Sequence, residues 1–199
     1  MRATIFFEGG GSAEATQSKC RQGLSEYCAK LKATGSRLRI VAAGGREQTF
    51  DKFMRAAADC RAGERVVLLV DSEGPVTAKT AARHLHAQDG WALAKLPEDD
   101  IFLMVQTMEA WFLADREALA AFYDGGFLPR ALPGSATSVE SIRKEDIEPA
   151  LRKATKGTNT KGEYHKIDHG SALLARIDPM KVGEASPHAA KFHEFLRSL

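Results

Sequence analysis

Short apolar runs and stretches with helical spacing alternate along the first half of the chain. The apolar runs are bounded by turn residues and predict strands at residues 3–8, 38–43, 66–70 and 100–106. Apolar positions with a helical repeat predict helices at 12–31, 49–60, 76–88 and 108–122, the first of them stopped by Gly35. This alternation indicates βαβ units and a mainly parallel sheet with helices on both faces. We therefore expect an α/β core of about four strands over residues 1–115.

The second half of the chain has a different pattern. Residues 123–138 are rich in Gly, Pro and Ser, which predicts a loop. Further helices are expected at 146–154, 170–176 and 188–199, with Asp178-Pro179 and Ser186-Pro187 as the breaks between the last elements. Residues 116–199 are thus predicted to form a mostly helical extension that packs on the core in one compact unit.

Composition adds only broad limits. The chain has 199 residues, of which 44% are hydrophobic and 27% are charged, as in ordinary soluble globular proteins. The net charge of +2 is nearly neutral, so bulk charge does not indicate nucleic-acid binding, although a local basic patch stays open. The three cysteines lack zinc-ligand spacing, and their odd number argues against a disulfide framework. With no membrane-length apolar stretch and no signal-peptide layout, we expect a cytoplasmic protein without a membrane partner.

Acidic residues follow two of the predicted strands. Glu8 comes directly after the first strand, and Asp71 and Glu73 come after the strand at 66–70. Carboxyl ends of parallel strands share one edge of a sheet, where ligands of open α/β sheets bind. Carboxylates gathered there repel one another unless a cation or a proton compensates. The oxygen ligands suit Mg²⁺ or Mn²⁺, so the pattern predicts a metal site.

Each of these acids also has a plainer interpretation. Glu8 could be a solvated strand end, Asp71 a turn or capping residue, and Glu73 a surface residue. The turn Gly9-Gly10-Gly11 lacks the third glycine of a dinucleotide fingerprint and the Gly-Lys-Ser/Thr of a P-loop. Its backbone amides could still approach a phosphate at the start of the next helix.

The acid–glycine turn and the later acidic pair resemble the Toprim fold. That fold is shared by topoisomerases, primases, small RNase-maturase type nucleases and the overcoming-lysogenization-defect nucleases. The resemblance covers roughly residues 3–106 and implies that Glu8 is a general acid/base or a metal ligand. It also implies that Asp71 and Glu73 hold Mg²⁺, with Glu73 standing where the family usually has aspartate.

A second resemblance spans nearly the whole chain. Segments 7–11, 69–73, 104–115 and 186–188 are similar to small Toprim-like proteins of unknown function. Members of that group are often encoded beside ATPases in contexts that look like phage defence. The resemblance implies a nuclease-like subunit with an ATPase partner.

Two polar residues after the fourth predicted strand are further candidates. Glu109 is either another acid of the site or a helix N-terminal charge favoured by the helix dipole. Gln106 would be a polar contact. Trp111 is expected to be a core aromatic, because large aromatic side chains usually serve burial. The aromatic-rich segment 102–112 could bury against a second chain, so a homodimer is one of the alternatives.

A basic segment between residues 152 and 169 is the last candidate. Such a run is usually a solvated loop, yet this one also carries Tyr164 and His169 and could fold over the acidic edge. Lys166 would then neutralise a phosphate in the transition state, and Tyr164 would stack on a base.

The sequence favours a Mg²⁺- or Mn²⁺-dependent phosphodiesterase that acts on DNA or RNA. In this hypothesis Glu8 and Lys166 are catalytic, Glu8, Asp71 and Glu73 hold the metal, and Gly9 and Gly10 let the substrate approach. The alternative is a non-catalytic regulatory or assembly partner of an ATPase. A third interpretation is a nucleotide sensor that uses the triglycine turn.

Overall fold

The computed structural model describes residues 2–11, 13–31, 37–134 and 138–199. Its strands are β1 (Arg2–Phe7), β2 (Leu38–Ala42), β3 (Glu64–Asp71) and β4 (Ile101–Met104), which form one all-parallel sheet in the order β2-β1-β3-β4. The expected α/β fold with a parallel sheet is therefore confirmed. The expected helix start at Ser12, its stop at Gly35 and part of the 123–138 loop lie outside the described residues.

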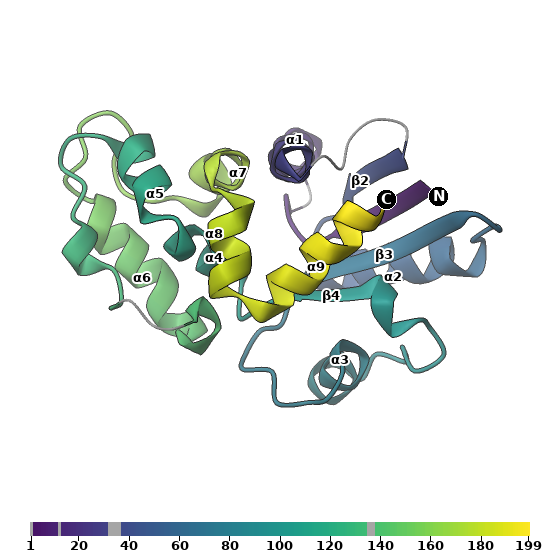
Figure 1. Ribbon diagram of the computed structural model, residues 1–199. Helices are drawn as coiled ribbons and strands as arrows, with labels where there is room; N and C mark the ends of the chain where they lie inside the picture. Colours follow the sequence, from purple (N-terminus) through teal and green to yellow (C-terminus); the bar gives the residue numbers. More distant parts are fainter. Residues whose placement is uncertain (1, 12, 32–36, 135–137) are drawn as a thin grey trace.

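Helices flank this sheet and continue to the end of the chain (Figure 1). Their bounds are α1 (Glu14–Lys30), α2 (Arg46–Ala58), α3 (Ala81–Asp89), α4 (Met108–Ala114), α5 (Arg116–Tyr123), α6 (Lys144–Thr155), α7 (Lys166–Arg176), α8 (Pro179–Ala185) and α9 (Pro187–Ser198). Short 3₁₀ segments are η2 (Glu98–Asp100), η3 (Pro129–Ala131) and η4 (Val139–Ser141).

Several helix boundaries differ from the expectation: α3 begins at Ala81 instead of 76, α7 begins at Lys166 instead of 170, and two further differences have local causes. The single helix expected at 108–122 is divided at Asp115, whose side chain accepts a hydrogen bond from Ala118 N and so begins α5. Asp178-Pro179 was expected to be a break, but it begins α8. Asp178 caps the helix through Met180 N, and Pro179 at the first helical position needs no hydrogen-bond donor.

The sheet buries a different core on each face. Alternating side chains separate Ile5 and Phe7 from Phe6 on β1. The Ile5 side packs with α1 and with helices from the second half of the chain, whereas the Phe6 side packs with Phe53 of α2 and Leu85 of α3. In Figure 1, α5 and α6 lie at the left, with α4, α7 and α8 between them and the sheet. Residues on both sides of position 115 thus share one core.

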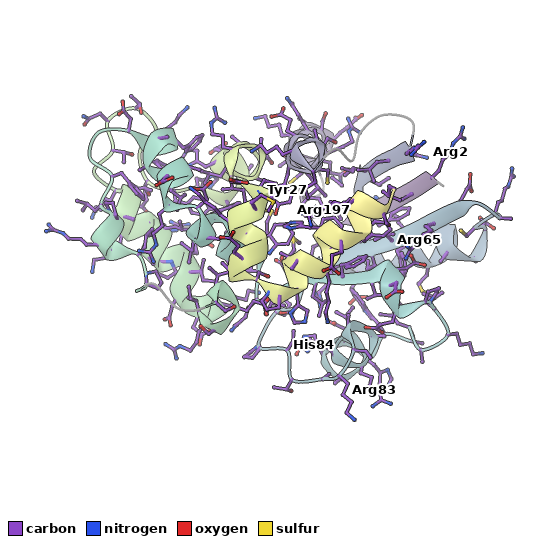
Figure 2. All side chains as sticks on the ribbon, viewed as in Figure 1. Arg2, Tyr27, Arg65, Arg83, His84 and Arg197 are labelled. Carbon is purple, nitrogen blue, oxygen red and sulfur yellow. The ribbon has the colours of Figure 1, made fainter. Side chains whose placement is uncertain are left out.

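Aromatic contacts join α1, α4 and α9. Tyr27, labelled in Figure 2, stacks on Trp111 with ring centroids 5.4 Å apart. Its hydroxyl lies 2.7 Å from His193 Nε2. Trp111 is fully buried, as expected for a core aromatic. These contacts fix the C-terminal helix against the N-terminal half of the chain.

Helix α7 lies directly against α1, and a glycine permits the close approach. A Cβ atom at Gly23 of α1 would lie 2.4 Å from the backbone oxygen of Ser171 in α7. Contact at this distance leaves no room for a methyl group. Gly23 therefore sets the position of α7, whose first residue is Lys166.

We expect Gly23→Ala to destabilise the fold by about 2 kcal/mol, because an extra methyl group in a packed contact usually costs about 1–3 kcal/mol. Urea unfolding measures the change. Gly134→Ala is the control, since a Cβ there would meet no atom of residues 2–11, 13–31, 37–134 and 138–199 within 4 Å. If both variants unfold at the wild-type urea concentration, the α1–α7 contact does not constrain α7.

Candidate active site

Three strands of the sheet lead to one open cavity. Glu8 follows β1, Asp71 ends β3, and the turn after β4 reaches Met108 at the start of α4. All three residues line a cavity of about 480 Å³, with walls from glycine turns 9–11 and 44–45 and from the starts of α1 and α7. A larger hollow of about 670 Å³ beside α9 contains none of the expected site residues. The convergence follows from parallel pairing, which places the carboxyl ends of the strands together.

Asp71 lies at the floor of this cavity and is 7% exposed. Its Oδ1 accepts a hydrogen bond from Met108 N at 2.8 Å, and its Oδ2 lies 3.2 Å from Thr107 Oγ1. The same hydroxyl is 2.5 Å from Glu109 Oε2. A hydroxyl carries one hydrogen and cannot donate to both carboxylates. If the shorter contact takes the hydrogen, Asp71 Oδ2 has no donor among the described side chains and is open to a proton, a cation or water from the cavity.

Glu109 is the best-satisfied acid of the site. It is 3% exposed, and besides Thr107 it accepts hydrogen bonds from the Tyr164 hydroxyl at 3.1 Å and from Lys166 Nζ at 3.0 Å. Burial favours the neutral acid, but Lys166 and Thr107 outweigh it and hold the pKa of Glu109 below its usual value. Burial likewise opposes the charge of Lys166, yet the nearby carboxylates of Glu109, Asp71 and Glu8 raise its pKa. Glu109 and Lys166 therefore form a charged pair in which Lys166 lines the cavity and Glu109 lies buried behind it.

Glu8 is held through one oxygen. Its Oε2 accepts from Arg46 at 3.1 Å and from Asp71 N at 3.3 Å, which leaves Oε1 without a hydrogen-bond partner among the described residues. Arg46 is fixed by two hydrogen bonds to Asp89, at 2.8 and 2.7 Å, and donates a third to the Asp71 backbone oxygen. Its guanidinium lies 5.0 Å from the ring centroid of Trp91. Arg46 thus fixes the orientation of Glu8.

The acidic side chains of the cavity are not balanced by cations of their own. Burial raises the pKa of Asp71 to about 8, and the charges of Glu8 and Glu109 add to this effect. Burial also raises the pKa of Glu8, with Glu73 adding and Arg46 opposing. Arg46 is shared with Asp89 and Lys166 is paired with Glu109, so the Glu8–Asp71 pair lacks a cation of its own.

A divalent cation fits this pair by its chemistry. Magnesium usually takes one or two protein carboxylates and completes its shell with water and substrate phosphate. Glu8 Oε1 and Asp71 Oδ2 are hard oxygen donors on one cavity, and neither holds a donated hydrogen in the arrangement above. In the part of the chain that the structure describes, no group of three His, Cys, Asp or Glu side chains is arranged to hold a metal. The expected set of three carboxylates is therefore reduced to two.

Glu73 does not line the cavity, although its charge acts on Glu8. It adopts φ 63° after the end of β3, forms an ion pair with Lys144, and lines a different hollow. Gln106 also turns from the cavity. Its Nε2 donates to Glu140 O at 3.2 Å, and its Oε1 accepts from Lys144 N at 3.0 Å. Gln106 links the sheet edge to the segment before α6 and is no contact for a ligand in this arrangement.

The two aromatic candidates of the basic segment are also placed differently from the expectation. Tyr164 is 1% exposed, so its ring offers no face on which a base could stack. It acts on the site through its hydrogen bond to Glu109. His169 lies outside the cavity, where its Nδ1 is 3.0 Å from the Tyr123 hydroxyl.

Gly9 and Gly10 do line the cavity. Gly9 pairs with Gly44 through Gly9 N to Gly44 O at 3.0 Å and Gly44 N to Gly9 O at 3.3 Å, which joins the two glycine turns. Gly10 has φ 84°, and a Cβ there would lie 2.6 Å from Gln17 Cα. Only glycine therefore suits this turn.

Sequence reasoning missed Arg46, Thr107 and His84. Arg46 follows Gly44-Gly45 after the second strand, at the same sheet edge as Glu8, so its position could have been inferred. Thr107 stands two residues before Glu109 and gave no separate signal. His84 is buried on α3 (Figure 2), with Nε2 2.8 Å from the Ser72 backbone oxygen. It fixes the turn that follows Asp71.

The chain belongs to the family described as a domain of unknown function, DUF4276, which it matches over residues 7–197. The match includes both the sheet and the C-terminal helices. No curated protein and no solved structure matches the chain. None of the helices in the described residues is long and apolar enough to cross a membrane.

Asp71→Asn should stabilise the metal-free protein at pH 8 by roughly 2 kcal/mol. The raised pKa of Asp71 means that its ionised form opposes folding, so this cost is largest above about pH 8 and fades as the pH falls toward 3.8. The gain over wild type should shrink on acidification. Urea unfolding in a chelator at several pH values tests this.

Asp115→Asn is the matched control with the opposite sign. Although burial alone would raise it, Lys181 and backbone donors hold the pKa of Asp115 below its usual value. The ionised form of Asp115 therefore stabilises the fold at pH 8, and its loss should destabilise. Destabilisation by Asp71→Asn at pH 8 would contradict the charge imbalance described above.

Proposed function

We propose that this protein is a metal-dependent phosphodiesterase that cleaves nucleic acid, with Mg²⁺ or Mn²⁺ as its cofactor. The observation that carries the proposal is the convergence of Glu8, Asp71 and Lys166 on one cavity, with Glu109 buried behind its wall as the partner of Lys166. A divalent ion there would neutralise a phosphodiester and activate water. The near-neutral net charge neither supports nor opposes the choice of substrate.

Each residue has a separate task in this proposal. Glu8 and Asp71 hold the metal through the oxygens that no protein group satisfies. Arg46 keeps Glu8 in place from the far side. Lys166 lines the cavity beside its Glu109 partner, and its ammonium binds a phosphate oxygen and stabilises charge that develops there.

The resemblance of residues 3–106 to the Toprim fold supports the same class. The acid after β1 and the acid at the end of β3 stand at the positions that the resemblance marks for metal chemistry, on a parallel sheet. The second resemblance, of nearly the whole chain to small Toprim-like proteins of unknown function, implies an ATPase partner and a context like phage defence, which we propose as the setting of the nuclease.

A second candidate is a non-catalytic regulatory or assembly partner of an ATPase. The ion pair between Glu73 and Lys144 favours it, because this pair removes the third carboxylate from the cavity. A protein that keeps this fold but no longer catalyses a reaction does not need its metal ligands, so we would expect it not to bind the metal.

Glu8→Gln should weaken Mn²⁺ binding and lower cleavage of single-stranded DNA or RNA by about a hundredfold or more, as loss of a group that acts on the reacting atoms does. The variant keeps the size of the side chain and removes its charge. Titration calorimetry measures the binding, and gel assays with purified protein measure cleavage.

Glu73→Gln is the matched control, because it makes the same change in the acid that pairs with Lys144. It should retain Mn²⁺ affinity and cleavage. Equal cleavage by wild type and Glu8→Gln would exclude the role of Glu8. Absence of Mn²⁺ binding by the wild-type protein would exclude the metal site and favour the non-catalytic alternative.

A further inference from the structure

The cavity that holds Glu8 and Asp71 is small and walled. Its volume of about 480 Å³ lies in the lower half of the range for ligand pockets, roughly 300–1,000 Å³. Helix α1 contributes Thr16 and Cys20 to the walls, together with Ala13 just before it, and α7 contributes Lys166, Ile167 and Ser171. The carboxylates therefore lie in a recess between two helices, which is too narrow for a duplex to enter.

The charges of the walls point to a short ligand. Among the described residues that line the cavity, Lys166 has the one cationic side chain. Double-stranded DNA carries a negative charge for every ~1.7 Å of its axis, and proteins that follow a nucleic-acid backbone neutralise it with a track of basic residues. One ammonium beside two carboxylates suits one phosphate held with a metal ion.

The remaining walls provide for the other parts of a nucleotide. Gly9, Gly10, Gly11, Gly44 and Gly45 bring bare backbone to one side of the cavity, next to Glu8. Met108 and Ile167 give apolar surface, and Ile167 is 56% exposed at the rim. Phosphate can lie near the carboxylates and the backbone amides, while a base packs on the apolar wall.

We propose that the cavity admits a single phosphorylated nucleotide unit, either free or at the end of a single strand, and excludes the interior of a strand or duplex. This inference rests on the proposed function for the metal ion and names its substrate class. It predicts attack from strand ends.

Cleavage tests the need for an end. Purified protein with Mn²⁺ is given one single-stranded sequence in linear and circular forms, and as a blunt duplex. The linear strand should be degraded to mononucleotides about tenfold faster, or more, than the circle or duplex. Cleavage of the circle at the rate of the linear strand would overturn the proposal.

Binding tests the cavity independently of turnover. Titration calorimetry with a mononucleotide, with and without Mn²⁺, compares wild type with Gly45→Asn. Gly45 has φ −74° and ψ 173°, it is the N-cap of α2, and a Cβ there meets no atom of the described residues within 4 Å. Asparagine is a favoured N-cap residue, so the variant should fold normally. Its side chain would accept hydrogen bonds from the first backbone N–H groups of α2 and would fill space at the cavity wall.

Gly45→Asn should keep Mn²⁺ binding, because Glu8 and Asp71 are unchanged. Its nucleotide affinity should fall about tenfold, because the new side chain fills part of the cavity. Gly134→Asn is the control, since Gly134 is equally open and does not line this cavity. If no nucleic acid is cleaved, the proposed phosphodiesterase activity is wrong. The binding of a mononucleotide then tests by itself whether the cavity admits a single nucleotide unit. No nucleotide binding by wild type, or equal binding by wild type and Gly45→Asn, would overturn the inference.

Discussion

The buried carboxylate of Asp71 is the constraint on which the arrangement around it depends. Through Oδ1 it ties the end of β3 to the start of α4, and its backbone amide holds Glu8. A buried carboxylate between two others is unfavourable for folding, since burial and like charges both oppose ionisation. The neighbouring cations reduce this cost without removing it, because each is already paired with another acid. Such unrelieved strain is typical of functional sites and supports a role for Asp71 beyond structure.

Much of the fold could be predicted because parallel strands buried on both faces are continuous apolar runs. Residues 66–70 have this character, and the sheet edge that receives Glu8 and Asp71 follows from strand direction alone. Glu73 could not be placed the same way. The alternation of side chains ends where the strand ends, and a residue with positive φ takes a direction that spacing does not give. Local chemistry likewise turned the expected break at Pro179 into the start of a helix.

The contents of the site were harder to predict than its location. Lys166 could be proposed from charge, since a basic segment has a reason to approach an acidic edge. The burial of Tyr164 depends on how α6, α7 and the loop between them pack, which no local pattern specifies. Arg46 was overlooked because a strand-end glycine pair looks like a simple turn. Its role appears only when Glu8, Asp89 and Trp91, from distant parts of the chain, are seen around it.

The C-terminal half of the chain supplies side chains that the site needs. Glu109 lies within residues 1–115, but Tyr164 and Lys166, which satisfy it, come from the later part of the chain. Without them a carboxylate that is 3% exposed would lose two of its three partners, which is costly for a buried charge. The contact of Gly23 with Ser171 holds α7 where Lys166 can reach Glu109. The family match, over residues 7–197, accordingly includes both the acidic edge and α7, the helix whose Lys166 pairs with Glu109.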